Sequence, residues 1–122
     1  MASASIAFEA PSLEKHGRMS SGSPIDLVHL AVQTMGDKAL EDEILNLFAR
    51  QARAALHDMA DAEGKALADV AHRLKSAASA VGAFRVVKHA EALEANPFDA
   101  GHLASISAAV VEAENFILKL MR

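Results

Sequence analysis

The amino-acid sequence predicts an all-α protein, an antiparallel up-down-up-down four-helix bundle with an additional short N-terminal helix. Apolar residues make up 52% of the 122-residue chain but aromatic residues only 4%, which favours closely spaced helices over a strand-rich sandwich. Apolar residues also recur at steps of three and four along successive segments, as in helices that bury one face. Long amphipathic helices joined by short loops form such a bundle, and the chain length suits one domain.

The first residues are expected to stand apart from the bundle. Residues 1–22 are rich in Ser, Ala and Gly, a composition typical of a flexible arm. Ile6 and Phe8 form the sizeable apolar pair of this arm, and they either dock on the bundle or belong to the tail. The folded domain is therefore expected over residues 23–122.

A short helix is expected to open the folded domain. Ser23 is placed to cap it, Pro24 suits the first helical position, and Asp26 brings a carboxylate to the third. The helix should run to about Thr34, because Gly36 interrupts the pattern that follows.

The second helix is expected to be long. Asp37 can cap it, and the acidic residues of its first turns are favoured there by the helix dipole. It should end between Ala60 and Gly64. The spacing predicts a buried face that consists of Leu40, Ile44, Leu47, Phe48, Ala52, Ala55 and Met59.

Three further helices are expected. One covers residues 65–81 and ends at Gly82, and the next covers residues 84–95. Residues 96–99 stop that helix, and Asp99 can cap the last one. The predicted core positions of these helices are Leu67, Val70, Ala71, Leu74, Ala77, Ala78 and Val81, then Val86, Val87, Ala90 and Leu93, and finally Leu103, Ile106, Val110, Ala113, Ile117 and Leu120.

A polar stripe runs beside the apolar face of segment 65–81. His72, Lys75, Ser76 and Ser79 share it, since residues three and four apart are neighbours on a helix surface. The small hydroxyl residues leave an open patch, which a large partner needs if it is to bring its own reacting group to the ring. Neutral imidazole is nucleophilic near physiological pH, because its ordinary pKa is about 6.5, whereas lysine, at about 10.4, is mostly protonated. His72 is therefore the predicted nucleophile, attacking through Nε2.

At these residues the sequence resembles the histidine phosphotransfer (HPt) family, whose members pass phosphoryl groups between receiver domains in bacterial and some eukaryotic phosphorelays. The family pattern is a His, an apolar residue, a Lys, a run of small residues and a Gly ten positions after the His. The chain supplies these as His72, Leu74, Lys75, Ser76, Ala77, Ala78 and Gly82. Ser76 stands where the family most often has Gly, so a partner's closest approach is slightly altered. The resemblance extends from about Pro24 to the C-terminus.

The resemblance implies roles for three side chains. His72 would accept a phosphoryl group from a receiver-domain aspartate and pass it to another receiver, while Lys75 would offset charge on the phosphoryl oxygens. In the family a Glu or Gln on the following helix commonly holds the second ring nitrogen and fixes the tautomer, and the matching position is Glu94. The protein would be a phosphocarrier and not an enzyme, with no kinase or ATP-binding activity.

The resemblance also implies the partners. These are response-regulator receiver domains, with a hybrid sensor histidine kinase as a further candidate. Ser76, Ser79 and Arg73 are expected on the surface that docks a receiver. No cofactor or metal is expected on this chain, because the Mg²⁺ and the acceptor aspartate would belong to the receiver. A monomer is the default expectation.

Other interpretations remain open from the residues alone. A pseudo-HPt or helical scaffold would bind receiver domains without accepting phosphate. A metal-binding bundle is weakened because no Glu-x-x-His pair projects from two helices. Lys75 and Glu94 also fit ordinary solvated charges, and Ser76 and Ser79 fit tolerated small residues. The other histidines fit surface positions, and they are His16, His29, His57, His89 and His102.

Composition argues against several classes of function. A formal net charge of −4 disfavours general nucleic-acid binding, and the lack of Cys excludes disulfides and thiolate chemistry. No GxxxxGK[ST] loop indicates a nucleotide site. No apolar run approaches the roughly 18 residues of a membrane span. The first residues lack the basic and apolar regions of a secretory signal, so a cytoplasmic location is expected, without membrane partners.

Overall fold

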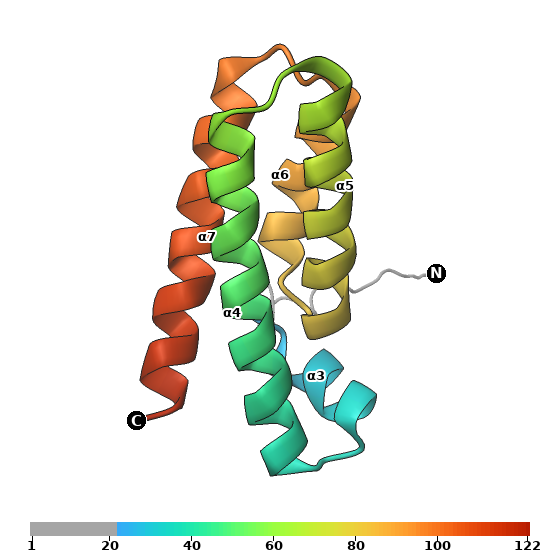
Figure 1. Ribbon diagram of the computed structural model, residues 1–122. Helices are drawn as coiled ribbons and strands as arrows, with labels where there is room; N and C mark the ends of the chain where they lie inside the picture. Colours follow the sequence, from blue (N-terminus) through green and yellow to red (C-terminus); the bar gives the residue numbers. More distant parts are fainter. Residues whose placement is uncertain (1–21) are drawn as a thin grey trace, which may run out of the picture.

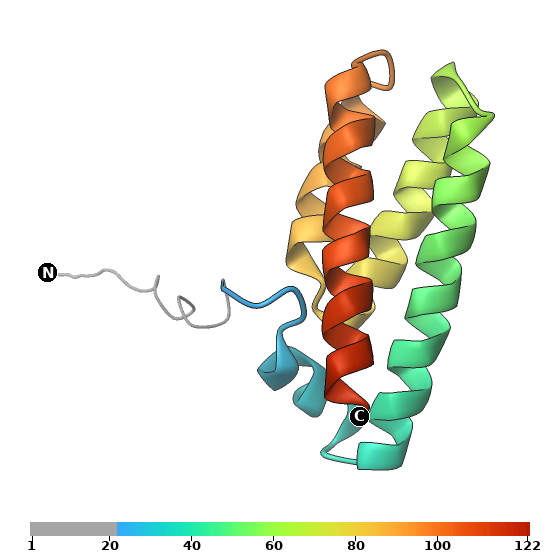
Figure 2. The ribbon, with the colours of Figure 1, turned by 90° about the vertical axis from the view of Figure 1, so that its left-hand side faces the viewer.

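The computed structural model describes residues 22–122, and all regular secondary structure in that range is helical. A short helix, α3 (Leu27–Thr34), precedes the longer helices α4 (Lys38–Ala60), α5 (Gly64–Val81), α6 (Phe84–Ala95) and α7 (Ala100–Leu120), as Figure 1 shows. The four longer helices run alternately up and down (Figures 1 and 2). The predicted all-α bundle with an additional short N-terminal helix is confirmed, whereas residues 1–21 of the predicted arm lie outside the described residues.

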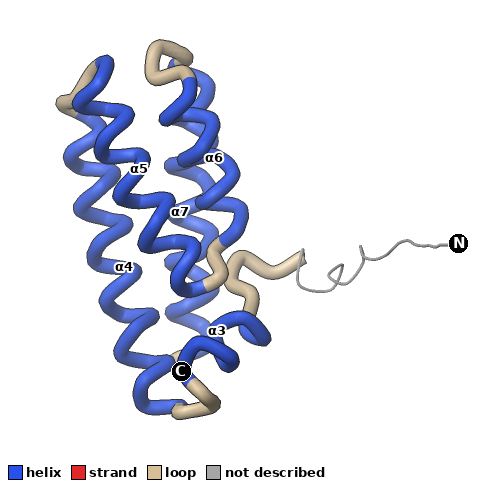
Figure 3. Tube along the Cα trace, turned by 90° about the vertical axis from the view of Figure 1, so that its right-hand side faces the viewer, coloured by secondary structure: helices blue, strands red, loops and turns tan. Residues whose placement is uncertain are grey.

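The four longer helices form a ring around one core. α5 packs against α4 and α6, and α7 packs against α6 and returns beside α4. α3 lies at one end of the bundle and contacts α4 and α5 (Figure 3). The outer side of α5 is therefore bordered by α4 on one edge and by α6 on the other.

Side-chain caps start two of the helices as predicted. The Asp37 carboxylate accepts a hydrogen bond from the backbone N–H of Leu40 at 3.1 Å, and Asp99 accepts one from Gly101 at 2.8 Å. Each carboxylate satisfies a backbone donor that has no partner within the helix.

The start of α3 differs from the prediction. Asp26, expected inside the first turn, is the N-cap and accepts hydrogen bonds from two backbone N–H groups of that turn. Ser23 does not cap the helix, because its hydroxyl donates to the carbonyl of Ile25 at 2.7 Å. The Asp26 N–H is bound to the carbonyl of Gly82 at 2.9 Å, which holds this stretch extended until the helix can begin.

The core agrees with the predicted stripes of α5, α6 and α7. On α4 the predicted core residues Phe48, Ala52, Ala55 and Met59 are buried, and the difference lies in the first half of the helix. Leu45 is fully buried, whereas Leu40 and Leu47, both predicted inside, are 38% and 46% exposed. The buried side chains of α4 keep steps of three and four, which leaves Leu47 off the stripe. Five other predicted core positions are only partly buried, at the rim of the core: Ile44, Ala77, Val87, Leu103 and Leu120.

Gly82 lies where the end of α5, the turn into α6 and the segment before α3 meet. It ends α5 in the left-handed conformation, with φ at 78°, as predicted for the turn residue. A Cβ atom at this position would lie 3.0 Å from the backbone oxygen of Asp26 and 3.1 Å from its Cβ. The missing side chain thus allows both the turn into α6 and the close approach of the segment that leads into α3.

Gly82→Ala is expected to lower the free energy of unfolding by about 2–4 kcal/mol, because it adds a collision with Asp26 to the cost of a left-handed backbone. Gly36→Ala is the matched control, since Gly36 has φ at 77° but open space where its Cβ would be. The control should cost about 1–2 kcal/mol. Urea unfolding followed by helical circular dichroism measures both, and equal losses would contradict the steric role of Gly82.

Candidate functional site

His72 lies in the middle of α5 with its side chain 58% exposed. The rotation of α5 is fixed by buried neighbours, because Ala71 is fully buried and Leu74 is 2% exposed. The imidazole therefore stands beside the core without entering it, as the apolar stripe of this segment predicts.

The turn after α5 determines which residue of α6 faces the ring. In two antiparallel helices with the same rise per residue, residues at equal distances from the connecting turn lie side by side. His72 precedes Ala83 by 11 residues and Glu94 follows it by 11 residues, counted along the sequence. The fully buried Leu93 fixes the rotation of α6, so the Glu94 side chain reaches toward α5.

The carboxylate of Glu94 contacts the other two residues for which a chemical role is predicted, His72 and Lys75. Nδ1 of His72 lies 2.8 Å from Oε2 of Glu94, and Nζ of Lys75 lies 2.9 Å from Oε1. Spacing predicts that His72 and Lys75 are neighbours and the family resemblance implies that Glu94 holds the ring, but neither predicts that the Lys75 ammonium binds Glu94. That contact crosses between helices, and its geometry depends on side-chain conformations that no spacing encodes.

The bond to Glu94 determines the tautomer of the ring. An ionised carboxylate can only accept hydrogen bonds, so Nδ1 carries the hydrogen and donates it. Nε2 of the neutral ring then keeps its lone pair, in a side chain that is more than half exposed. This is the nitrogen that can act as a nucleophile toward a group brought by a partner.

Mutual pairing keeps both members of the ion pair charged. The hydrogen bond from Lys75, followed by the weaker one from His72, lowers the pKa of Glu94 against the opposing effect of desolvation. The same hydrogen bond with Glu94 raises the pKa of Lys75. Both shifts favour the charged forms, so Glu94 is an anion at neutral pH.

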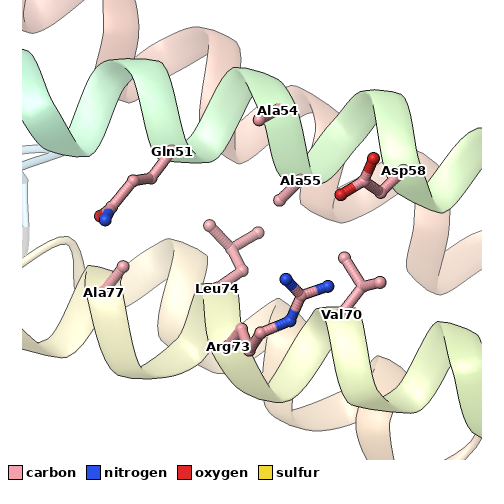
Figure 4. A pocket seen from close by; sticks show the side chains of 8 residues that line it. All are labelled: Gln51, Ala54, Ala55, Asp58, Val70, Arg73, Leu74 and Ala77. Carbon is pink, nitrogen blue, oxygen red and sulfur yellow. The ribbon is translucent and has the colours of Figure 1, made fainter.

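The predicted docking residues fall on two sides of α5. Ser76 is exposed and Ser79 half-buried, both on the face that carries His72. Arg73 is exposed but points to the α4 side, where it lines a hollow between α4 and α5 (Figure 4). The two serines thus lie about one and two turns from His72 on the same face of α5, whereas Arg73 lies on the side of α4.

The hollow itself is not predicted from the sequence. It has a volume of about 240 Å³, and short side chains on the two facing helices leave the space. The alanines of the two segments are the sequence feature that indicates such a space. Spacing alone, however, does not show that the alanines of one helix face those of the other. The residues that line the hollow are Gln51, Ala54, Ala55, Asp58, Val70, Arg73, Leu74 and Ala77 (Figure 4).

His29 is predicted at the surface, but it is partly buried in the structure. His29 on α3 is half-buried, its Nε2 is buried without a hydrogen-bond partner, and its ring meets Phe84 edge-on at a centroid distance of 5.2 Å.

Among residues 22–122, no group of three His, Cys, Asp or Glu side chains is arranged to hold a metal ion. Within the same range no helix has the length and apolar character needed to span a membrane.

The Lys75–Glu94 pair should make stability depend on pH in the acidic range. Because the folded-state pKa of Glu94 lies below its ordinary value of 4.5, its contribution is present above about pH 4.5 and is lost as the pH falls through the folded-state value. The difference in unfolding free energy between the wild type and Glu94→Gln should therefore shrink as the pH falls below 4.5. Urea unfolding at a series of pH values measures this difference.

Glu91→Gln is the matched control, because it removes the same charge from α6 and Glu91 acts on Lys75 through its charge. The difference in unfolding free energy between the wild type and Glu91→Gln should vary less with pH than the difference for Glu94→Gln. A Glu94→Gln difference that stays constant down to pH 2 would contradict the ion pair.

The chain matches the family model for the Hpt domain over residues 43–117, a range that includes His72, Lys75 and Glu94. Neither the comparison with curated proteins nor the comparison with solved structures found a match. The matched range covers most of α4, all of α5 and α6, and most of α7, which is the bundle that positions the site. Since this match spans more than half of the sequence, the chain belongs to the Hpt domain family.

Proposed function

We propose that this protein is a phosphocarrier of a two-component phosphorelay, in which His72 takes a phosphoryl group from one receiver-domain aspartate and gives it to another. Hpt domains are phosphocarrier modules of two-component signalling and are not kinases. The observation that best supports the role of His72 is its Nδ1 bond to Glu94 in a side chain that is 58% exposed. We further propose that it acts in the cytoplasm as a monomer.

The chemistry of uptake needs little from this chain beyond a correctly presented ring. The lone pair on Nε2 attacks the phosphorus of an aspartyl phosphate, the N–P bond forms, and the P–O bond breaks with its electron pair returning to the aspartate. Positioning and charge stabilisation dominate such transfers. The receiver would supply the aspartate and its Mg²⁺, so this chain would need no cofactor of its own.

The exposed position of His72 favours a protein surface over a small molecule as the partner. The ring stands on the outside of a helix, and the small Ser76 and Ser79 follow it on the same face. Apolar side chains are also exposed on α3, which contacts α5: Val28 is 70% exposed, Val32 69% and Met35 93%. Exposed apolar patches mark sites of protein contact, and receivers are the partners we propose.

His72→Gln should abolish phosphoryl uptake while leaving the helical fold intact, since the side chain is mostly outside the core. The test incubates each variant with a phosphorylated receiver domain and measures acid-labile, base-stable phosphate on the product. His57→Gln, at an exposed histidine of α4, is the control and should retain uptake. Binding without phosphate gain by the wild type would favour a pseudo-HPt scaffold, and uptake by His72→Gln would place the phosphoryl group elsewhere.

Ser76→Arg should weaken receiver binding by at least about tenfold, because a long charged side chain replaces a small one next to the ring. A calorimetric titration with a receiver domain measures the dissociation constant. Ala104→Arg introduces the same side chain at an exposed position of α7 and should bind as the wild type does. Equal affinity of the Ser76 and Ala104 variants would remove this face from the docking surface.

A further inference from the structure

Glu94 uses its two carboxylate oxygens for different partners, the ring of His72 and the ammonium of Lys75. We infer that ionised Glu94, held by Lys75, keeps the hydrogen on Nδ1 of His72 after the ring has been phosphorylated as well as before. The phosphoryl group then remains transferable at neutral and mildly alkaline pH. This inference deepens the proposed function and rests on it.

The state of Nδ1 matters because it determines the leaving group. When the phosphoryl group departs, the Nε2–P bond breaks and its electron pair stays on Nε2, while an oxygen of the receiver carboxylate forms the new bond to phosphorus. With a hydrogen on Nδ1, the ring leaves as neutral imidazole. Without it, the ring would leave as an imidazolate anion, which is a far poorer leaving group. No proton has to move during the step, since the phosphorylated ring is a cation that becomes neutral on transfer.

The charge of Glu94, and not only its oxygen atom, supplies this effect. The Oε2 atom lies 2.8 Å from Nδ1, so the negative charge directly faces the hydrogen that the phosphorylated ring must retain. An opposite charge at this distance favours the cationic form of the ring. A glutamine at the same position could accept the same hydrogen bond and orient the ring, but it would bring no charge to stabilise the cation.

Lys75 acts in this arrangement through Glu94. Its ammonium lies 2.9 Å from Oε1, and this contact is the largest cause of the lowered pKa of Glu94. Lys75 is therefore a positioning residue: by holding Oε1 it keeps Oε2 directed at Nδ1 of His72. Lys75 is also expected to offset charge on the phosphoryl oxygens, and the two roles can be separated by their dependence on pH.

Other charged groups near the ring are engaged differently. On α5, Asp69 lies one turn before His72 and is bound by Lys65 at 3.1 Å. On α6, Glu91 lies one turn before Glu94 and acts on Lys75 through its charge. The hydrogen bond of the ring goes to Glu94. Glu91→Gln consequently removes one nearby negative charge without removing that bond, which makes it the matched control.

The decisive experiment compares the pH profiles of phosphoryl transfer from His72. Wild type, Glu94→Gln and Glu91→Gln are phosphorylated by a receiver domain, and the single-turnover rate of transfer to a second receiver is measured from pH 6 to 9. The ratio of wild-type to variant rates cancels the pH dependence of the receiver. For Glu94→Gln the ratio should grow with pH, by up to about tenfold per unit once the ring loses its proton. For Glu91→Gln it should stay nearly constant. A constant ratio for Glu94→Gln would overturn the inference and leave Glu94 an orienting role.

Lys75→Ala tests the second part of the inference. If Lys75 holds the Glu94 carboxylate against Nδ1, its removal should loosen that contact and slow transfer mainly at high pH. It should add no further pH-dependent loss to Glu94→Gln in a double-mutant cycle. A rate loss that is uniform across pH and independent of Glu94 would contradict this role. Circular dichroism of each variant checks that the helical content is unchanged.

A measurement on the unphosphorylated protein separates this inference from the proposed function. Nitrogen-15 spectra of the neutral ring report which nitrogen carries the hydrogen, and they require no phosphoryl donor. Nδ1–H is expected for the wild type, and Nε2–H would overturn the inference whatever the transfer assays show. A wild-type protein with Nδ1–H that takes up no phosphoryl group would contradict the proposed function instead.

Discussion

The candidate site of this structure depends on one carboxylate placed between two helices. Glu94 projects from α6 to α5 and contacts both His72 and Lys75. The contact to the ring selects the tautomer, and the contact to the lysine holds the carboxylate in place and lowers its pKa. Without Glu94 the imidazole would be an exposed side chain free to rotate and to exchange tautomers. With it, the hydrogen is held on Nδ1, and Nε2 keeps its lone pair in a side chain that is 58% exposed.

The fold explains why the Glu94 carboxylate lies level with His72 along the helix pair. Gly82 turns the chain sharply, and α6 returns along α5 with residues paired at equal distances from Ala83. Buried small and branched side chains then fix how each helix is rotated about its own axis. The approach of Asp26 to Gly82 ties the N-terminal segment to the same turn. The position of the site is thus set by the core and by one turn.

Much of this arrangement can be predicted from the sequence, and the remainder depends on tertiary contacts. The caps at Asp37 and Asp99 and the turn at Gly82 follow from local chemistry, which spacing and residue type express directly. The start of α3 and the burial of Leu45 in place of Leu47 do not, because they depend on neighbours distant in sequence. The Lys75–Glu94 contact and the hollow beside Arg73 likewise appear only once the helices are packed.

The most direct measurement determines which ring nitrogen of His72 carries phosphorus. Phosphorylated protein labelled with nitrogen-15 would show a coupling between phosphorus and one nitrogen of the imidazole. Because Glu94 occupies the Nδ1 side, the account predicts that phosphorus is bonded to Nε2 of His72. Phosphorus on Nδ1, or on another histidine, would contradict it.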